Sequence, residues 1–534
     1  MKLERKQPVG RRQRKHPAIF TALCLLLAAC NIGRETTGVP AGFIGGVAAD
    51  EPRAALAGRD ILAAGGSAAD AVVATYLTMA VTLPSRAGLG GGGMCLAYDP
   101  RLNRVEALDF TARASTSGSA SVPANVRGML TLYGRQGRLR WEQLVAPAES
   151  FARFGVPVPR ALAMDLAAAA PVLSRDDAAR QVFLRADGTP LAEGDTLSQP
   201  ELANFLTALR VHGGAELYQG ALASRFAEAA ALSGATITVE DMRAVAATPK
   251  PSIIVRHDDL VVHFAPPPAV VGIVEAELFA ALAPRWRRTS ADERAHLLAE
   301  TELRVAQDRA RWLAPDLSTR MPTATLVSAQ HLDELMASYR ADRRTASAPS
   351  GPLLQQRNVN TATAGVVAVD RDGGAVACSF TMNELFGLGR MAGRTGVLLA
   401  AAPDHAGRGP QMLGPVLAAM ARGGRIVFGS TSSGGWPQAS ATVQVMLRTI
   451  VDGRPLEEAI DAARIHNPGD GDNVMVEAAV QARMPGLAPR GYDPSVVPVL
   501  GTVNAIFCPE GLFENAEACQ FRADRRGFGL GIGG

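Results

Sequence analysis

The sequence lacks the short patterns that commonly hold a metal ion. It contains neither a CxxC nor an HExxH pattern, and its eight histidines are scattered along 534 residues. Closely spaced Cys, His and carboxylate ligands are typical of zinc sites. The sequence therefore predicts no metal site, and no cofactor is expected.

The apolar run near the N-terminus, residues 18–29, is too short to span a bilayer, which requires about 20 residues. It follows a basic segment, and the two together predict an export signal. The Leu-Ala-Ala-Cys sequence at 27–30 resembles a bacterial lipoprotein cleavage box, in which Cys30 becomes the lipidated first residue. The alternative is an ordinary secretory signal cleaved nearby. Both predict an exported, periplasmic protein, and the first also predicts a membrane anchor.

The excess of basic residues that nucleic-acid binding requires is also missing. The whole chain carries a net charge of +3, but residues 1–30 hold seven of its 54 Lys and Arg and one of its 51 Asp and Glu. The mature chain keeps 47 basic and 50 acidic residues, a net charge of −3. Nucleic acid is therefore not an expected partner.

Cysteine is scarce, with six in the whole chain. Cys24 leaves with the leader. Cys95 and Cys378 lie in apolar, strand-like runs and are expected to be buried thiols. Cys508 and Cys519 flank a turn near the C-terminus, where an oxidising compartment would allow them to bridge two strands.

The stretch 360–383 predicts a β-hairpin. A valine-rich run is followed by the turn sequence Asp-Arg-Asp-Gly-Gly at 370–374 and by a second apolar run. A three-residue loop would place Thr363 directly opposite Thr381, with Asn383 just beyond. Two threonines and an asparagine would then converge at the open end of one hairpin.

A threonine hydroxyl becomes a good nucleophile only beside a base. The α-amine of the same residue supplies one when the chain is cut just before it, and its pKa of about 7.7–8.0 suits a general base. The segment 343–360, rich in Ser, Pro, Arg, Gln and Asn, predicts the exposed loop that such a cut before Thr363 requires. An isolated threonine most often merely begins a strand, so the hypothesis depends on its neighbours.

The rest of the chain predicts helices and one glycine-rich turn. Asp50 and Ser67 are expected to cap two successive helices. The glycine run 88–93 satisfies GxGxxG, but it enters a strand-like run instead of opening a helix, so it predicts close backbone approach and no dinucleotide site. Residues 125–250 predict helices that cover the sheets, and 299–312 predicts a further helix.

Together these features resemble the γ-glutamyltranspeptidases, members of the N-terminal-nucleophile hydrolases. The resemblance runs from about residue 42 to the C-terminus. It rests on Thr363, Val369-Asp370-Arg371-Asp372-Gly373, Thr381-Met382-Asn383, Phe386-Gly387-Leu388-Gly389, Ala392-Gly393, the segment 60–73, and the glycine run with Asp109-Phe110 after it.

The resemblance implies an α+β fold, a four-layer αββα sandwich. It also implies that the precursor cuts itself between Ala362 and Thr363. The expected parts are a signal peptide at 1–30, a large chain at 31–362 and a small chain at 363–534. The two chains would stay together as a heterodimer, because the sheets are shared between them.

The resemblance further implies the catalytic roles. The freed Thr363 would attack an amide and form an acyl-enzyme, with its own amine as base and with Thr381 and Asn383 orienting that amine. Gly434 and Gly435 would donate backbone N–H groups to the oxyanion; without the resemblance, a plain glycine turn would be the simpler interpretation. Water or an amine acceptor would release the acyl group, which in the family is γ-glutamyl, commonly from glutathione.

The glutamate-binding residues of the family are not all present. The arginine that follows the family's Asp-Phe is Thr111 here, and Arg113 is the expected substitute because alternate residues of a strand share a face. The anchors of the α-amine align with Ala402 and His405, which leaves Asp404 as the nearest carboxylate.

The family's Ser-Ser pair corresponds to Gln411-Met412. The expected function is thus a γ-glutamyltransferase or glutathione hydrolase with diverged recognition of a small-molecule γ-glutamyl or other amide substrate. A related amidase or acylase of different specificity is one alternative. A non-catalytic lipoprotein that keeps the fold is the other, although such a protein would have no use for the two threonines and the asparagine.

Overall fold

The computed structural model describes residues 42–534 except 117, 119, 346–361, 404–408, 410, 411, 470–472, 479–485 and 513. All of these described residues belong to one compact unit, Val39–Gly534. The expected leader, Cys30 and most of the predicted loop 343–360 lie outside the described residues. Within the described part of the chain, no helix is both long and apolar enough to cross a bilayer.

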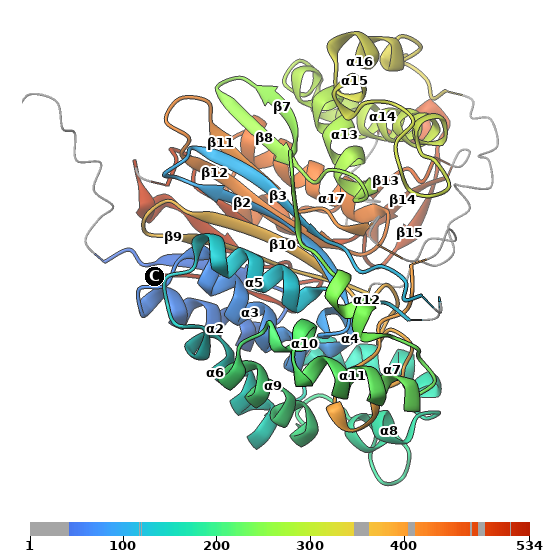
Figure 1. The fold of residues 1–534 in the computed structure, drawn as a ribbon. Coiled ribbons are helices and arrows are strands. Elements are labelled where there is room, and N and C mark those ends of the chain that lie inside the picture. The colour runs from blue at the N-terminus through green and yellow to red at the C-terminus, as the bar shows by residue number, and fades with distance from the viewer. Residues whose placement is uncertain are drawn as a thin grey trace, which may run out of the picture. The chain divides into compact units, whose positions relative to one another are not determined.

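Two β-sheets form the centre of this unit (Figure 1). The seven-stranded sheet has the order β18 (Leu530–Gly533), β1 (Gly45–Ala49), β9 (Thr363–Asp370), β10 (Ala375–Thr381), β2 (Gly92–Asp99), β3 (Arg104–Phe110), β6 (Thr248–Lys250). The six-stranded sheet has the order β17 (Gln520–Arg522), β16 (Thr502–Phe507), β12 (Ile426–Ser433), β11 (Val416–Met420), β8 (Leu260–Phe264), β7 (Ile253–His257). Two small sheets add β13 (Ile465–His466), β14 (Asn473–Glu477) and β15 (Asp493–Val497), and β4 (Val156–Pro157) with β5 (Thr196–Leu197).

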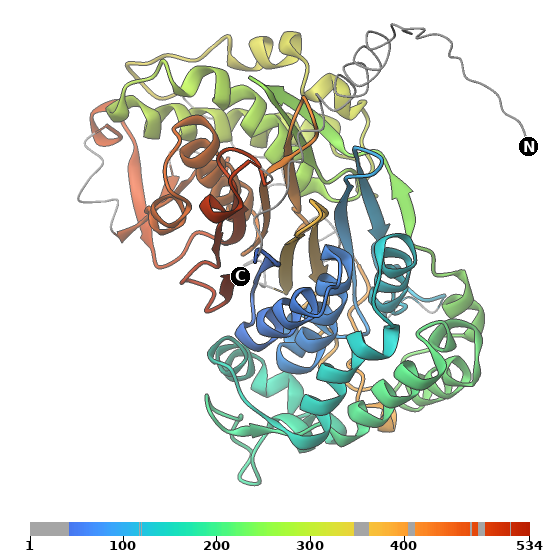
Figure 2. The same ribbon diagram turned by 90° about the vertical axis from the view of Figure 1, so that its left-hand side faces the viewer.

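Helices cover the outer face of each large sheet, and Figure 2 shows the blue, teal and green group on one side and the yellow-green and orange-red group on the other. The group over the seven-stranded sheet comprises α2 (Pro52–Ala63), α3 (Ala68–Thr82), α4 (Pro84–Ala87), α5 (Asn125–Gln136), α6 (Trp141–Phe154), α7 (Arg160–Leu173), α8 (Asp177–Phe183), α9 (Pro200–His212), α10 (Glu216–Gln219), α11 (Ala221–Leu232) and α12 (Val239–Ala244). The group over the six-stranded sheet comprises α13 (Val270–Trp286), α14 (Ala291–Trp312), α15 (Thr323–Leu326), α16 (Ala329–Met336), α17 (Pro437–Met446) and α18 (Leu456–Asp461).

Three apolar cores lie between these layers. Alternate residues of each strand point to opposite faces, so each sheet packs on both of its faces. Along β9, Val366 and Ala368 pack against the first helix group. Val367 and Val369 instead pack between the two sheets. A third core joins the six-stranded sheet to the second helix group. The predicted four-layer αββα sandwich and the helical cover at 125–250 are confirmed.

The predicted hairpin is confirmed in register. The loop has three residues, 371–373, and Gly373 adopts a φ of 88°, which favours glycine. Asp370 Oδ1 accepts the backbone N–H groups of Asp372 and Gly374, each at 2.9 Å, and thereby fixes the loop. Thr363 consequently lies directly opposite Thr381.

The cysteines form two disulfides, Cys95–Cys378 and Cys508–Cys519. The second agrees with the bridge that the turn between these cysteines allows. The prediction that Cys95 and Cys378 are buried thiols is wrong, although both are buried. They face each other across β2 and β10, with 4.0 Å between their Cα atoms, and their separation of 283 residues conceals this pairing in the sequence.

Ser67 caps α3 as predicted, with its hydroxyl accepting from Asp70 N–H at 3.1 Å. The prediction that Asp50 caps α2 is wrong, because Glu51 is the cap and accepts from Ala54 N–H at 2.7 Å. The glycine run enters β2 as predicted. A β-carbon on Gly91 would overlap the carbonyl oxygen of Thr381, so glycine permits the close approach there.

A substitution at Gly365 tests how closely the two large sheets pack against each other. A β-carbon at this position would overlap the Thr431 side chain of β12. We expect Gly365→Ala to lower the free energy of unfolding by about 1–3 kcal/mol because it overpacks the core, measured by denaturant unfolding. Gly134→Ala is the matched control: Gly134 is an exposed helical residue with open space around its β-carbon position, so this change should be neutral or slightly stabilising. Equal stability of Gly365→Ala and wild type would contradict the described packing.

Candidate active site

Thr363 begins β9, which lies between β1 and β10. Its side chain points to the same face as those of Val367 and Val369, the face that packs against the six-stranded sheet. Only 4% of Thr363 is exposed. Among the described residues, none forms a hydrogen bond with its hydroxyl. The hydroxyl is thus held at the edge of the space between the sheets.

The strand that faces β9 brings the glycine turn to the same place. Gly365 packs against Thr431, and Val367 packs against Gly429, so β9 and β12 run past each other in opposite directions. One further two-residue step places Thr363 by Ser433, immediately before the Gly434-Gly435 turn.

Both turn residues have a positive φ, 116° at Gly434 and 75° at Gly435. A β-carbon on Gly434 would also lie 2.7 Å from the Cα of Gly501. Packing is therefore sufficient reason for glycine at this position, whatever its role in catalysis. No described residue accepts a hydrogen bond from either N–H group of the turn. Trp436 follows directly, and the Arg309 guanidinium stacks on its ring at 3.7 Å. The turn therefore has two N–H groups without protein acceptors in the described part of the chain.

Thr381 and Asn383 are joined by a hydrogen bond. The Thr381 hydroxyl accepts from Asn383 N–H at 2.9 Å, and Asn383 has a φ of 62°, a conformation that asparagine tolerates. Its Nδ2 donates to the Ala401 carbonyl at 2.8 Å and to the Ser121 hydroxyl at 3.2 Å. These bonds orient the side chain and leave Oδ1 as its remaining acceptor.

The bond that self-cleavage would break also has a donor beside it. The carbonyl of Ala362 accepts a hydrogen bond from Met382 N–H at 3.3 Å. An N–H group in this position stabilises negative charge when the carbonyl is attacked. The hairpin therefore holds the Thr363 hydroxyl and a donor to the Ala362 carbonyl together.

The place of Asp50 beside the strand of Thr363 could not be predicted from the sequence, which indicated only a helix cap. Its Oδ2 accepts from Gly365 N–H at 2.7 Å, and its Oδ1 accepts from Asn504 Nδ2 at 2.8 Å. Burial raises the pKa of the Asp50 carboxyl, while the Asn504 bond, the charge of Arg86 and the Gly365 bond oppose that rise. Because Gly365 is two residues from Thr363, Asp50 fixes the strand that carries the hydroxyl. No local pattern could show this, since Asp50 and Gly365 are 315 residues apart.

The predicted substrate residues are only partly brought together. Thr111 and Arg113 line one cleft of about 450 Å³. They do not share a strand face as expected, because β3 ends at Phe110. The Thr111 hydroxyl donates to Asp109 at 2.7 Å, and Asp109 also pairs with Lys250 at 2.7 Å.

The Arg113 side chain is exposed and has no ionic or hydrogen-bonding partner among the described residues. Pro403 lines the same cleft, two residues beyond the Ala401 that binds Asn383. Met412 is buried, does not line the cleft, and accepts from Gln438 Nε2 through its carbonyl. Asp404 and Gln411 lie outside the described residues.

Residues 54–527 match the model of the Gamma-glutamyltranspeptidase family. The chain belongs to this family. It is 28% identical over 504 residues to the glutathione hydrolase proenzyme of Escherichia coli strain K12, covering 85% of this chain and 84% of that relative. It is 27% identical over 402 residues to the glutathione hydrolase proenzyme of Bacillus subtilis strain 168, covering 68% of each.

Solved structures show the same fold. The cephalosporin acylase from Bacillus halodurans superposes with a TM-score of 0.78 at 22% identity, covering 91% of this chain and 95% of that one. The γ-glutamyltranspeptidase of Helicobacter pylori gives a TM-score of 0.52 at 22% identity, covering 55% and 91%. As a γ-glutamyltranspeptidase family member, the chain is an enzyme of the hydrolase and transferase class, so the alternative of a non-catalytic scaffold is set aside.

The hydrogen bonds of Asp50 can be tested by exchanging its carboxylate with the amide of Asn504. Asp50→Asn should lower the free energy of unfolding by about 1–3 kcal/mol. The NH2 group of the new amide would face one of the two donors, Gly365 N–H and Asn504 Nδ2, and leave it without an acceptor. Self-cleavage should also slow. The double variant Asp50→Asn/Asn504→Asp restores one acceptor for each donor, so it should recover much of both losses, measured by unfolding and by processing rate. If the double variant is no better than the sum of the single changes, Asp50 does not act through these bonds.

Proposed function

We propose that this chain is a self-cleaving enzyme whose nucleophile is Thr363. The observation that carries the proposal is the placement of this hydroxyl at the start of β9, beside a target carbonyl that already accepts the Met382 N–H. The Thr363 oxygen attacks the Ala362 carbonyl carbon, and the peptide nitrogen leaves as the α-amine after taking the hydroxyl proton. Water then hydrolyses the resulting ester, which frees the Ala362 carboxylate and restores the hydroxyl.

In the mature enzyme the new α-amine is the general base. Thr363 attacks the amide carbon of a substrate, and its proton passes through the amine to the leaving nitrogen. We assign the orientation of the amine to Thr381 and to Asn383 Oδ1, and the oxyanion to the N–H groups of Gly434 and Gly435. Water or an amine acceptor then attacks the acyl-enzyme, so the same intermediate supports hydrolysis and transfer.

For the substrate we propose a γ-glutamyl amide, as the names of the glutathione hydrolase relatives suggest, with weakened recognition of its α-carboxylate. Thr111 replaces the arginine anchor, and its hydroxyl is engaged by Asp109. Two cations line the cleft; Lys250 pairs with Asp109, whereas the Arg113 side chain has no ionic partner among the described residues and could meet a carboxylate. The same observation favours a second candidate, a related amidase or acylase whose acyl group lacks the glutamyl charges.

The mature protein would consist of residues 31–362 and 363–534. The disulfide between Cys95 and Cys378 would then join the large chain to the small chain covalently. We further propose export through the N-terminal signal and a lipid anchor at Cys30, which would hold the enzyme at the periplasmic side of a membrane.

Self-cleavage and the interchain bond can be read from one pair of gels. Wild type should give two bands after reduction, the smaller beginning at Thr363, and one band without reduction because Cys95–Cys378 joins them. Thr363→Ala lacks the hydroxyl and should remain a single chain in both gels. Ser at position 363 is the conservative control and should retain slow cleavage. Cleavage of the alanine variant at the same bond would overturn the assignment and direct attention to Thr361.

The glutamate clamp can be tested by restoring it. Thr111→Arg should raise kcat/KM for a γ-glutamyl anilide by roughly tenfold or more, since a charged hydrogen bond contributes about 1.5–3 kcal/mol. Asp109 keeps Lys250 as its partner in this variant. The control is a neutral acyl anilide, whose rate should not rise. If wild type is already efficient on the γ-glutamyl anilide and Arg113→Ala abolishes that activity, Arg113 has replaced the anchor and recognition has not weakened.

A further inference from the structure

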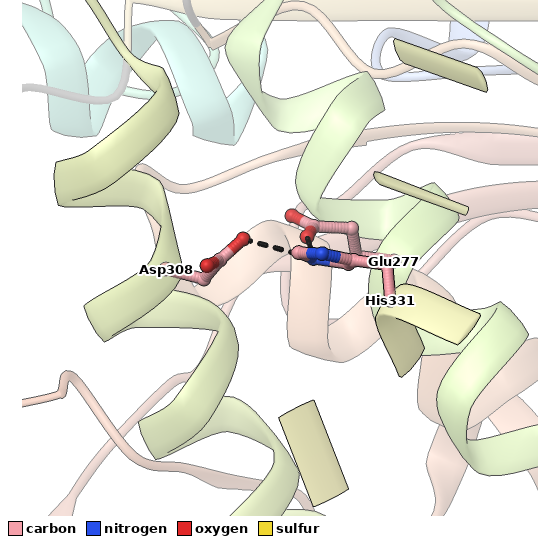
Figure 3. A group of neighbouring side chains, drawn as sticks. All are labelled: Glu277, Asp308 and His331. Carbon is pink, nitrogen blue, oxygen red and sulfur yellow. Dashed lines mark ion pairs between the residues drawn. The ribbon is translucent and has the colours of Figure 1, made fainter. Parts of the chain in front are cut away.

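Three potential metal ligands meet in the helical layer that covers the six-stranded sheet. Glu277 on α13, Asp308 on α14 and His331 on α16 point toward one another (Figure 3). His331 Nε2 lies 3.0 Å from Asp308 Oδ2 and 3.4 Å from Glu277 Oε1. One ligand atom from each residue lies within 4.8 Å of the other two.

Four polar atoms of this group have no hydrogen-bond partner within the described chain. They are both carboxylate oxygens of Glu277, Asp308 Oδ2 and His331 Nε2, although His331 Nε2 lies within ion-pair distance of both carboxyl groups. The Glu277 side chain is fully buried, and that of Asp308 is 4% exposed. Buried carboxylates without partners are costly, by several kcal/mol each. The arrangement therefore indicates a missing ligand.

We propose that Glu277, Asp308 and His331 bind one divalent transition-metal ion, with Zn²⁺ and Mn²⁺ as the fitting ions. Imidazole nitrogen suits Zn²⁺, and carboxylate oxygen suits both ions. Ligands at about 2.0–2.2 Å from a tetrahedral zinc are roughly 3.3 Å apart, close to the two His331 distances. The side chain of His331 is 14% exposed, so the group lies close to the protein surface.

Charged groups on two neighbouring helices surround Glu277. Asp308 and Arg309 of α14 and His331 of α16 face it. A divalent cation held by the two carboxylates would offset part of the cost of burying their charges.

The proposed role is structural. The three ligands come from three helices, so an ion would hold α14 and α16 against α13. Asp308 also precedes Arg309, which stacks on Trp436 beside the Gly434-Gly435 turn. The ligands are separated by 31 and 23 residues and share no short motif, which is why the sequence predicted no metal site.

The test is calorimetric titration of the full-length protein, stripped with a chelator, with ZnCl₂ and separately with MnCl₂ at pH 8. One site with a micromolar or lower Kd is expected for at least one ion, with a higher Tm for the loaded protein. His331→Gln and Glu277→Gln should each weaken binding at least tenfold. Glu275→Gln is the matched control, since Glu275 is a fully buried carboxyl on the same helix outside the group, and it should retain wild-type affinity.

Absence of binding by both ions up to 1 mM would overturn the proposal and leave a proton-sharing cluster of two carboxyls and a histidine. Unchanged affinity in His331→Gln would also overturn it, because the ion would then sit elsewhere. His331 is partly exposed, so His331→Gln carries the test if Glu277→Gln does not fold. Unchanged affinity in a folded Glu277→Gln variant would exclude Glu277 as a ligand.

Discussion

The position of Thr363 is fixed by the pairing of β9 with strands on both of its sides. β1 binds one edge of β9 and β10 binds the other, so the start of the strand cannot shift without breaking both ladders. Both large sheets contain strands from before and from after position 363. A cut at this position therefore leaves the hydrogen bonds and the apolar cores of the sandwich intact, and the new N-terminus stays where the strand holds it.

A buried carboxyl group and a glycine turn lie on either side of this strand. Asp50 reaches across from the end of β1 to the backbone of Gly365, and burial raises its pKa, so its place must be stabilised by the two hydrogen bonds that it accepts. On the facing sheet, the Gly434-Gly435 turn has a backbone conformation that favours glycine. In the proposed mechanism the two sheets thus supply different parts of the chemistry: the nucleophile and its orienting groups come from one, and the oxyanion donors come from the other.

The turn residues made part of the candidate site predictable from the sequence. The turn residues at 370–374 determine the loop length, and the loop length determines that Thr363 faces Thr381. The pairings that the sequence concealed are non-local: Cys95 with Cys378, Asp50 with Gly365, and His331 with Glu277 and Asp308. The strand that was expected to continue through Arg113 ends at Phe110, since Asp109 turns back to accept the Thr111 N–H and hydroxyl. The non-local pairings, in contrast, depend on packing between distant segments, which periodicity and turn signals do not encode.

The central claim is that Thr363 carries the acyl group during turnover. Processed enzyme should be mixed with an excess of its best amide donor, quenched in acid within the first turnovers, digested and mapped by mass spectrometry. The account predicts an acyl mass increment on the peptide that begins at Thr363, located on that residue and lost when an amine acceptor is present. An increment on another residue, or turnover with no acyl adduct on this peptide, would contradict it.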